Sequence, residues 1–466
     1  MNYEVIVIGG GIGGLTAAAL LAARGVNVCL FERQSNVGGC IANVEHQGYT
    51  FEPTAGLYSG WEPGGIYDRI FAELPVNPPE VHRLSPAYVV RLPDRSEISV
   101  CEQIDGFEAN LGEGFPECSA AAIAFYRRLR QTIESNARYS HHPGAEITAN
   151  YLADTSSRFR GFIDAQLEIL TQCASEQCDL LQAANVLTAP QRGLWAIRDG
   201  AQTLADVLAQ SLKVSGGTLR LNAPVLRLAF DRNGIPAGVD LLSGERVNAT
   251  RAIVSNLTVW DTYGKLIGTG RTPKAVSAAL KQLHGRGAYL MFLAMEKDAG
   301  SRLPADHILG CHGWREGDAE RDSPFMFATA PLRDSRSTAT HRAVTISTLT
   351  NVEEWFTFHE DGAAHEAQDQ AALELWWGRL HAALPELGDS VEVIETATPR
   401  TFYELTRRKL GMIGKPRANF TSSAPSRALV TTDYPNLFLV GDTVSGGSGL
   451  EAICESALSL ADSIVR

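Results

Sequence analysis

The chain contains 466 residues, more than one hydrophobic core usually holds, and this length predicts about three domains. Its 44% apolar and 20% charged residues are typical of a folded globular protein and exclude general disorder. Asp and Glu (53) outnumber Lys and Arg (41), which gives a net charge of −12 with no basic run. An acidic chain without a basic stripe excludes nucleic acid as an expected partner.

The first predicted elements form a strand–helix–strand unit. Residues 3–8 (YEVIVI) are a β-branched apolar run, typical of a strand buried on both faces of a parallel sheet. Residues 15–24 are rich in Ala and Leu, which predicts a helix that ends at Gly25, and residues 26–31 (VNVCLF) predict a second strand. The three elements together span about thirty residues, the usual size of a βαβ unit.

Further elements follow along the chain. Helices are expected at residues 118–139, 158–187 and 201–215, and strands at residues 218–221, 225–230, 238–242, 246–254 and 436–440. Residues 288–294 and 344–349 are expected to form strands of a second sheet, and a C-terminal helix follows a Gly-rich turn. Strand–Gly–helix segments at both ends predict a discontinuous nucleotide domain with a second domain inserted into it.

Eight cysteines are too few for a disulfide scaffold, and they show neither a CxxC pair nor zinc-type spacing, so no metal site is expected. Cys173 and Cys178 have the C-x4-C spacing of a flavoprotein redox disulfide, but we expect two thiols on one helix within residues 167–187. The N-terminus lacks the pattern of a signal peptide, and no apolar stretch reaches the ~18 residues of a membrane span. We therefore expect a cytoplasmic protein, with peripheral attachment to a membrane as an open alternative.

Gly9-x-Gly11-x-x-Gly14 joins the first strand to the first helix. In such a loop the first Gly permits a tight turn, the second lets the backbone approach a pyrophosphate, and the third allows close helix–strand packing. The helix N-terminus adds partial positive charge. Glu32 lies 32 − 14 = 18 residues beyond the last Gly, near the ~20 expected for a carboxylate that binds ribose hydroxyls. This context predicts a dinucleotide site.

A second candidate cofactor segment lies near the C-terminus. Residues 437–442 (LFLVGD) read as a strand that ends in Gly441-Asp442, and Gly449-Leu450 begins the last helix. Asp442 could hold a ribityl hydroxyl, and the helix N-terminus could face the edge of a flavin where negative charge appears on reduction. Two such turns suit the opposite ends of one extended cofactor.

These motifs resemble those of the flavin monoamine-oxidase/phytoene-desaturase superfamily. The resemblance rests on the N-terminal fingerprint, Gly38-Gly39, residues 247–256 (VNATRAIVSN) and the segment NLFLVGDTVSGGSG. Residues 398–416 (TPRTFYELTRRKLGMIGKP) resemble bacterial-type phytoene desaturases and carotenoid cis–trans isomerases in particular. The resemblance implies one non-covalent FAD, bound through Gly9, Gly11, Ile12, Gly13, Gly14, Glu32, Arg33, Gly39, Cys40, Val225, Gly441, Asp442, Gly449 and Leu450.

The chain also departs from this pattern. Desaturases and amine oxidases usually have Arg after the paired glycines, where Cys40 stands here, and the isomerase branch often has a small residue there. The start of the last helix, at Gly449, resembles the amine-oxidase pattern more than that of the desaturases. The branch of the superfamily is therefore left open.

We expect an α/β fold: a Rossmann-like FAD-binding domain of the amine-oxidase type with an inserted mixed α+β substrate domain. The FAD-binding domain is assigned to residues 1–60, 190–275 and 400–466, and the substrate domain to residues 61–189 and 276–399. The resemblance implies desaturation or cis–trans isomerisation of a long apolar polyene, with quinone or O2 as possible electron acceptors. The alternatives are an amine-oxidase-like or other C–H dehydrogenase and, in another class, a non-catalytic prenyl-lipid carrier.

Catalytic candidates come only from the resemblance, which places Tyr403, Glu404 and Glu451 in segments beside the flavin. No second GxGxxG follows a strand, so we expect no tightly bound NAD(P)H. A further hypothesis is that one apolar helix face docks on a membrane, although a helix that faces the core would show the same stripe of apolar residues. Its apolar positions are Phe159, Phe162, Ile163, Leu167, Leu170 and Cys173.

Overall fold

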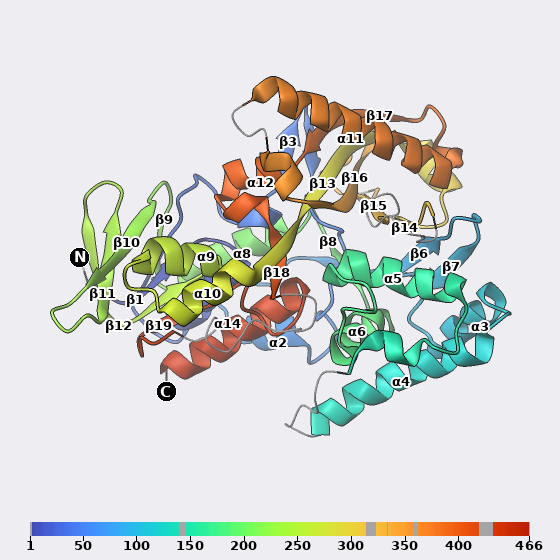
Figure 1. The fold of residues 1–466 in the computed structure, drawn as a ribbon. Coiled ribbons are helices and arrows are strands. Elements are labelled where there is room, and N and C mark those ends of the chain that lie inside the picture. The colour runs from blue at the N-terminus through green and yellow to red at the C-terminus, as the bar shows by residue number, and fades with distance from the viewer. Residues whose placement is uncertain are drawn as a thin grey trace.

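The computed structural model describes residues 2–138, 146–313, 323–332, 334–357, 361–418 and 432–465. These residues form two large sheets, with most of the helices packed around them (Figure 1). Strand β13 (Leu283–Glu296) runs from beside helix α10 (Lys274–Gln282) up into the second sheet. The predicted mixed α/β architecture is therefore confirmed.

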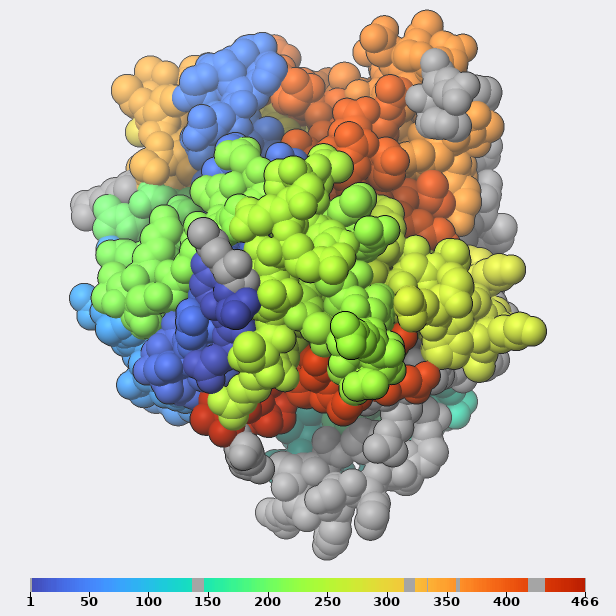
Figure 2. Space-filling model, turned by 90° about the vertical axis from the view of Figure 1, so that its left-hand side faces the viewer, coloured from blue at the N-terminus to red at the C-terminus, as the bar shows by residue number. Residues whose placement is uncertain are grey.

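The first sheet contains the predicted βαβ unit. Its strands are β1 (Asn2–Ile8), β2 (Val28–Phe31), β9 (Thr218–Arg220), β10 (Val225–Phe230), β11 (Pro236–Leu241), β12 (Arg246–Ser255) and β19 (Leu437–Leu439). β1 pairs in parallel with β2 and β12, and β12 pairs in parallel with β19, whereas β10 and β11 add an antiparallel edge. Figure 2 looks onto this edge, with the N-terminal segments in dark blue and the C-terminal segments in red beside it.

Three helices cover one face of this sheet. α1 (Ile12–Ala23) packs against α8 (Gln202–Val214) and α14 (Gly449–Val465). α1 is buried over nearly its whole length, which explains why its sequence is apolar on all sides rather than striped. The C-terminal helix thus completes the core of the N-terminal βαβ unit, so segments from both ends of the chain pack together.

The second sheet is mostly antiparallel and contains both strands predicted for it. Its strands are β6 (Tyr88–Arg91), β7 (Glu97–Val100), β13, β14 (His307–Gly310), β15 (Phe325–Thr329), β16 (His341–Asn351), β17 (Val391–Ala397) and β18 (Ile413–Ala418). β13 pairs with β16, β17 and β18. β18 lies within residues 400–466, which the sequence assigned to the FAD-binding domain, so that boundary is wrong for this strand. The reason is long-range pairing, which local sequence patterns do not show.

The remaining helices and two small two-stranded sheets surround the two large sheets. The helices are α2 (Ile66–Phe71), α3 (Ile104–Gly114), α4 (Ser119–Arg138), α5 (Ser157–Thr171), α6 (Leu180–Leu187), α7 (Ala189–Arg192), α9 (Val259–Asp261), α11 (Gly362–Ala383) and α12 (Pro399–Thr406). β3 (Val44–His46) and β4 (Tyr49–Phe51) form a hairpin, and β5 (Val81–Arg83) pairs antiparallel with β8 (Trp195–Ile197), which is distant in the chain.

The helix predicted over residues 158–187 is two helices. α5 ends where Gln172 adopts a left-handed conformation (φ 63°), and Asp179 caps the start of α6 by accepting from the Gln182 N–H (2.8 Å). Cys173 and Cys178 therefore lie in the connecting loop and not on a helix. Both thiols are buried and lie within hydrogen-bonding reach of each other.

The apolar stripe proposed for membrane docking faces the core. Phe159, Phe162, Ile163 and Leu167 of α5 are fully buried against α3, α4 and the second sheet. The docking hypothesis for this face is therefore wrong, and the core-facing alternative holds. Within the part of the chain that the structure describes, no helix is long and apolar enough to cross a membrane.

Candidate functional site

A large cavity of about 600 Å³ opens at the carboxyl ends of the parallel strands. Gly9 follows β1, Glu32 follows β2, Asn256 follows β12, and Gly441 follows β19, and all of them line it. In open α/β sheets the carboxyl ends of the strands are where nucleotides bind. From there the cavity extends along β13 and β16 of the second sheet.

The glycine loop is packed too tightly for side chains. A Cβ on Gly14 would lie 2.1 Å from the carbonyl oxygen of Gly9, and a Cβ on Gly13 would lie 2.7 Å from Oδ1 of Asn256. Asn256 also donates from Nδ2 to the Gly9 carbonyl (3.3 Å). The loop therefore stays close to the strand ends, and the N-terminus of α1 faces the cavity, as an anionic diphosphate requires.

Glu32 is held at the cavity edge by two backbone groups. Its Oε2 accepts from the Gly10 N–H (2.7 Å), and its Oε1 accepts from the Gln34 N–H (2.8 Å). Each oxygen keeps lone-pair capacity for another donor, because a carboxylate offers about four acceptor positions. This geometry suits the predicted contact with two ribose hydroxyls.

Asp442 forms a two-point ion pair with Arg408, whose Nη1 and Nη2 lie 3.1 and 2.7 Å from the two carboxylate oxygens. Both residues line the cavity. Arg408 comes from the segment between α12 and β18, and the sequence reasoning did not single it out. Asn256 was missed in the same way, although an Asn directly after a buried strand is a usable signal for a strand-end site.

The far end of the cavity is uncharged and largely apolar, although Gln172, Ser347 and Thr348 also line it. Leu290 and Phe292 of β13, Leu349 of β16, Phe402 of α12 and Ile413 of β18 line this end. The lining residues contributed by the second sheet, α5 and α12 include no Asp, Glu, Lys, Arg or His. The cavity thus joins a polar cofactor end to an uncharged end in the second domain.

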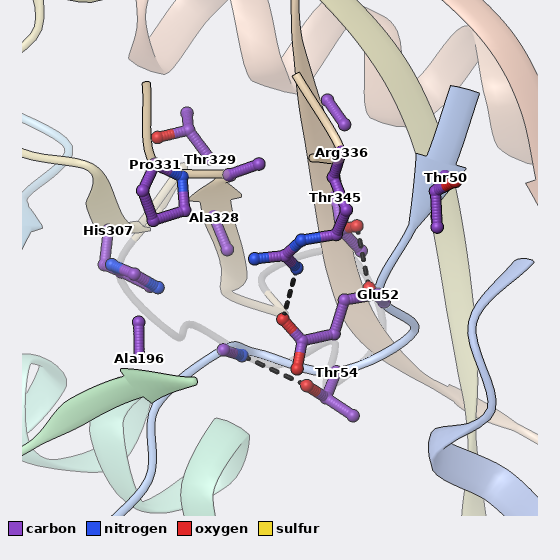
Figure 3. A pocket seen from close by; sticks show the side chains of 13 residues that line it. Thr50, Glu52, Thr54, Ala196, His307, Ala328, Thr329, Pro331, Arg336 and Thr345 are labelled. Carbon is purple, nitrogen blue, oxygen red and sulfur yellow. Dashed lines mark hydrogen bonds and ion pairs between the residues drawn. The ribbon is translucent and has the colours of Figure 1, made fainter. Parts of the chain in front are cut away.

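A buried polar cluster lies beside the cavity wall (Figure 3). Arg336 donates to Glu52 (2.6 Å) and makes a two-point contact with Asp334. Glu52 also accepts from the hydroxyl of Tyr58, which is 2.6 Å from the hydroxyl of Thr54. Thr54 and Tyr58 line the large cavity, so the cluster fixes the position of this wall segment.

His307 faces a small cavity of about 20 Å³ in the same cluster (Figure 3). Burial lowers the pKa of His307 to about 4, and the nearby Asp306 only partly opposes this effect. His307 is therefore neutral near pH 7. It is a polar lining group there and not a charged one.

The structure brings the predicted cofactor residues together. The large cavity is lined by Gly9, Gly11, Ile12, Gly13, Glu32, Arg33, Gly39, Cys40, Val225, Gly441, Asp442, Gly449 and Leu450. Gly14 lies behind this surface and acts through packing. No group of three or more His, Cys, Asp or Glu with metal-binding geometry occurs among the described residues.

The three catalytic candidates are absent from the cavity lining. Glu404 is exposed and pairs with Arg400 (3.1 Å), while the ring of Tyr403 packs edge-to-face on Phe356. Glu451 accepts a hydrogen bond from Ser59 on the cofactor side. Their segments adjoin the cavity through the neighbouring residues Phe402, Leu405 and Leu450, but the family resemblance could not give the direction of each candidate side chain.

Comparison with protein families assigns the fold and the cofactor class. The family described as "Flavin containing amine oxidoreductase" matches residues 111–465, and a "NAD(P)-binding Rossmann-like domain" matches residues 7–74. The chain belongs to the flavin-containing amine oxidoreductase family. FAD is therefore its cofactor, and the glycine cradle, the paired backbone contacts of Glu32 and the strand-end cavity fit this molecule.

Relatives of this flavoenzyme include carotenoid enzymes. The prolycopene isomerase of Arabidopsis thaliana is 25% identical over 98% of this chain and 82% of its own length. The ζ-carotene-forming phytoene desaturase of Myxococcus xanthus is 23% identical over 97% of this chain and 92% of its own. An oxidoreductase structure from Methanosarcina mazei shares the fold with a TM-score of 0.72, at 17% identity over 99% of this chain and all of that one.

Proposed function

We propose that this protein uses FAD to act on a long apolar polyene, by desaturation or by cis–trans isomerisation. The uncharged end of the cavity is the observation that carries the proposal. Leu290, Phe292 and Phe402 offer dispersion contacts to a hydrocarbon, and the wall there carries no charge that such a substrate would have to desolvate. The names of the relatives support the same substrate class.

An amine substrate fits this cavity less well. A protonated amine would need a carboxylate beside it, because an unpaired buried charge is costly. The charged residues of the lining are Glu32, Arg33, Asp261, Arg408 and Asp442, all of which lie at the cofactor end. A carrier without a cofactor is also disfavoured, since it would have no use for the tight glycine cradle.

Bound FAD would supply a hydride acceptor for desaturation, whereas cis–trans isomerisation leaves the oxidation state of the polyene unchanged. The residues of the chain position the substrate and exclude water. The apolar wall holds the polyene. The hydroxyls of Thr54 and Tyr58, which are hydrogen-bonded to each other and anchored to Glu52, keep the neighbouring wall in place. A hydrocarbon offers no polar handle, so shape and length of the cavity determine which bond reaches the flavin.

The wall variant Leu290→Glu tests this assignment. Leu290 is buried on the cavity wall, and a carboxylate there should abolish conversion of phytoene and prolycopene while bound FAD, measured by its absorbance, is retained. Leu242→Glu is the matched control, because Leu242 is 67% exposed on the surface and conversion should be unchanged. Equal conversion by both variants, or selective gain of amine oxidation by the first, would overturn the proposal.

A further inference from the structure

The loop after the paired glycines provides no positive charge for the cofactor. Gly38 and Gly39 are followed by Cys40, which lines the cavity in the short 3₁₀ turn Gly39–Ile41 (η1). Burial raises the pKa of the Cys40 thiol, so the side chain is neutral near pH 7. The cation usual at this point in the family is therefore missing from the loop itself.

Arg408, which is distant in the chain, brings a positive charge close to this loop. Arg408 lies near enough to Cys40 for its charge to oppose the rise in the pKa of the thiol, and it lines the same cavity. It is held there by Asp442 and by the carbonyl of Met412, which accepts from its Nε (2.6 Å). Arg407, one residue earlier, takes a left-handed conformation (φ 58°) at the end of α12, and this turn directs the following residue inward.

Only two basic residues line the cavity among the residues that the structure describes, Arg33 and Arg408. Arg33 donates to the carbonyls of Glu404 and Leu405 and so fastens α12 to the cavity edge. The bonds of Arg408 use one N–H of each of its three nitrogens, while a guanidinium has five N–H groups. Its two terminal nitrogens therefore each retain a second N–H.

We propose that Arg408 is the phosphate-binding cation of this FAD site and replaces, from the segment between α12 and β18, the arginine that the paired-glycine loop lacks. Asp442 holds the guanidinium in a fixed orientation and leaves its remaining N–H groups for the diphosphate oxygens. A planar guanidinium binds phosphate through paired hydrogen bonds, which a lysine cannot reproduce. Without Arg408, the Asp442 carboxylate would lose the cation with which it is paired at the cavity.

The alternative is that Arg408 only positions Asp442 for the ribityl chain, and three probes distinguish the two roles. FAD contains the diphosphate and the ribityl chain, ADP contains only the diphosphate, and riboflavin contains only the ribityl chain. Binding of each to the full-length apoprotein is measured by calorimetry. Arg408→Gln should weaken FAD and ADP by about ten- to a hundredfold, the usual range for charge-assisted hydrogen bonds, and leave riboflavin unchanged.

Two controls keep this test decisive. Arg407→Gln removes the neighbouring charge, which is exposed and lies over Tyr403, and should change none of the three affinities. Cys40→Arg combined with Arg408→Gln returns a cation to the loop and should restore ADP binding to within a fewfold of the wild type.

If Arg408→Gln does not fold, Arg408→Lys keeps a charge beside Asp442 and should still weaken the binding of ADP more than that of riboflavin. Unchanged ADP affinity in a folded Arg408 variant would overturn the proposal.

Discussion

Glu52 and Arg336 form a buried ion pair, with 2.6 Å between Oε2 and Nη1, although 284 residues separate them in the chain. Glu52 directly precedes the segment that lines the cavity, and Arg336 belongs to the loop between β15 and β16 of the second sheet. The pair therefore connects the cavity wall to the substrate domain. Asp334 also accepts from Arg336, and Glu52 also accepts from the hydroxyl of Tyr58 and from the Ala201 N–H.

Removal of Arg336 should destabilise the protein strongly. Arg336→Met leaves the carboxylates of Glu52 and Asp334 buried without their cation, and such a loss typically costs about 3 to 5 kcal/mol. Arg198→Ala breaks the exposed pair with Glu80 and should change the unfolding free energy little. Urea unfolding followed by tryptophan fluorescence compares the two variants, and similar midpoints would show that the buried pair adds no stability.

Stability should fall as the pH is lowered, with a contribution from His307. Because the folded pKa of about 4 lies below the ordinary value of 6.5, the unfolded chain binds the proton more readily, and protonation favours unfolding. The contribution is full above pH 6.5 and is lost towards pH 4, about 3 kcal/mol in all and about 2 kcal/mol between pH 7 and pH 5. His307→Gln should remove this part of the slope in urea titrations at the two pH values. An identical slope in the wild type and the variant would contradict the assignment.

Glu32→Ala should weaken FAD binding by about ten- to a hundredfold, because two charge-assisted bonds to ribose are lost. The variant also loses the contacts that hold Gly10 and Gln34, whereas Glu32→Gln keeps an acceptor and should be affected less. Fluorescence titration of the apoprotein with FAD gives both constants. Wild-type affinity in a folded Glu32→Ala protein would place the ribose elsewhere.

Gly14→Ala should yield protein with little bound flavin. Its Cβ would lie 2.1 Å from the Gly9 carbonyl, and this contact with backbone can be relieved only by moving the loop. Gly112→Ala in α3 is the control, since a Cβ there meets no atom within 4 Å and Ala favours a helix. The ratio of flavin to protein absorbance reports the difference. Equal flavin content would mean that the close approach has no role in binding.

The parts of the fold that the sequence predicts best are local ones. The N-terminal βαβ unit, β10 and the C-terminal helix follow from apolar periodicity and glycine punctuation, which act over a few residues. The break between α5 and α6 was not predicted from the sequence because the apolar spacing continues across it. Asp179 caps the start of α6, but in the sequence alone it cannot be distinguished from an acidic residue on the solvent face of a helix. Local sequence patterns therefore predict that a helix or strand exists better than they predict the residues at which it begins and ends.

The candidate site likewise contains residues that the sequence predicts and residues that it does not. The cofactor residues Gly9, Glu32 and Asp442 each stand in a recognisable motif, and their segments converge as expected. Arg408 lies in the family-like segment 398–416 but was not singled out there, and Arg336 lies in no motif. The partners of both residues are distant in the chain, so their pairing follows only from the folded backbone. The expectation that no NAD(P)H binds tightly stays a prediction.

Anaerobic incubation with phytoene and with prolycopene, each supplied in amounts below that of the bound FAD, tests the proposed function most directly. The flavin is oxidised in one sample, where it is the electron acceptor, and chemically reduced in another, and the products are analysed by chromatography and mass measurement. Desaturation would lower the product mass by two hydrogens, and isomerisation would give a new retention time at unchanged mass. We expect one of these two results, with no oxidation of putrescine supplied in parallel. Unchanged polyenes together with oxidation of the amine would contradict the account and assign the cavity to an amine substrate.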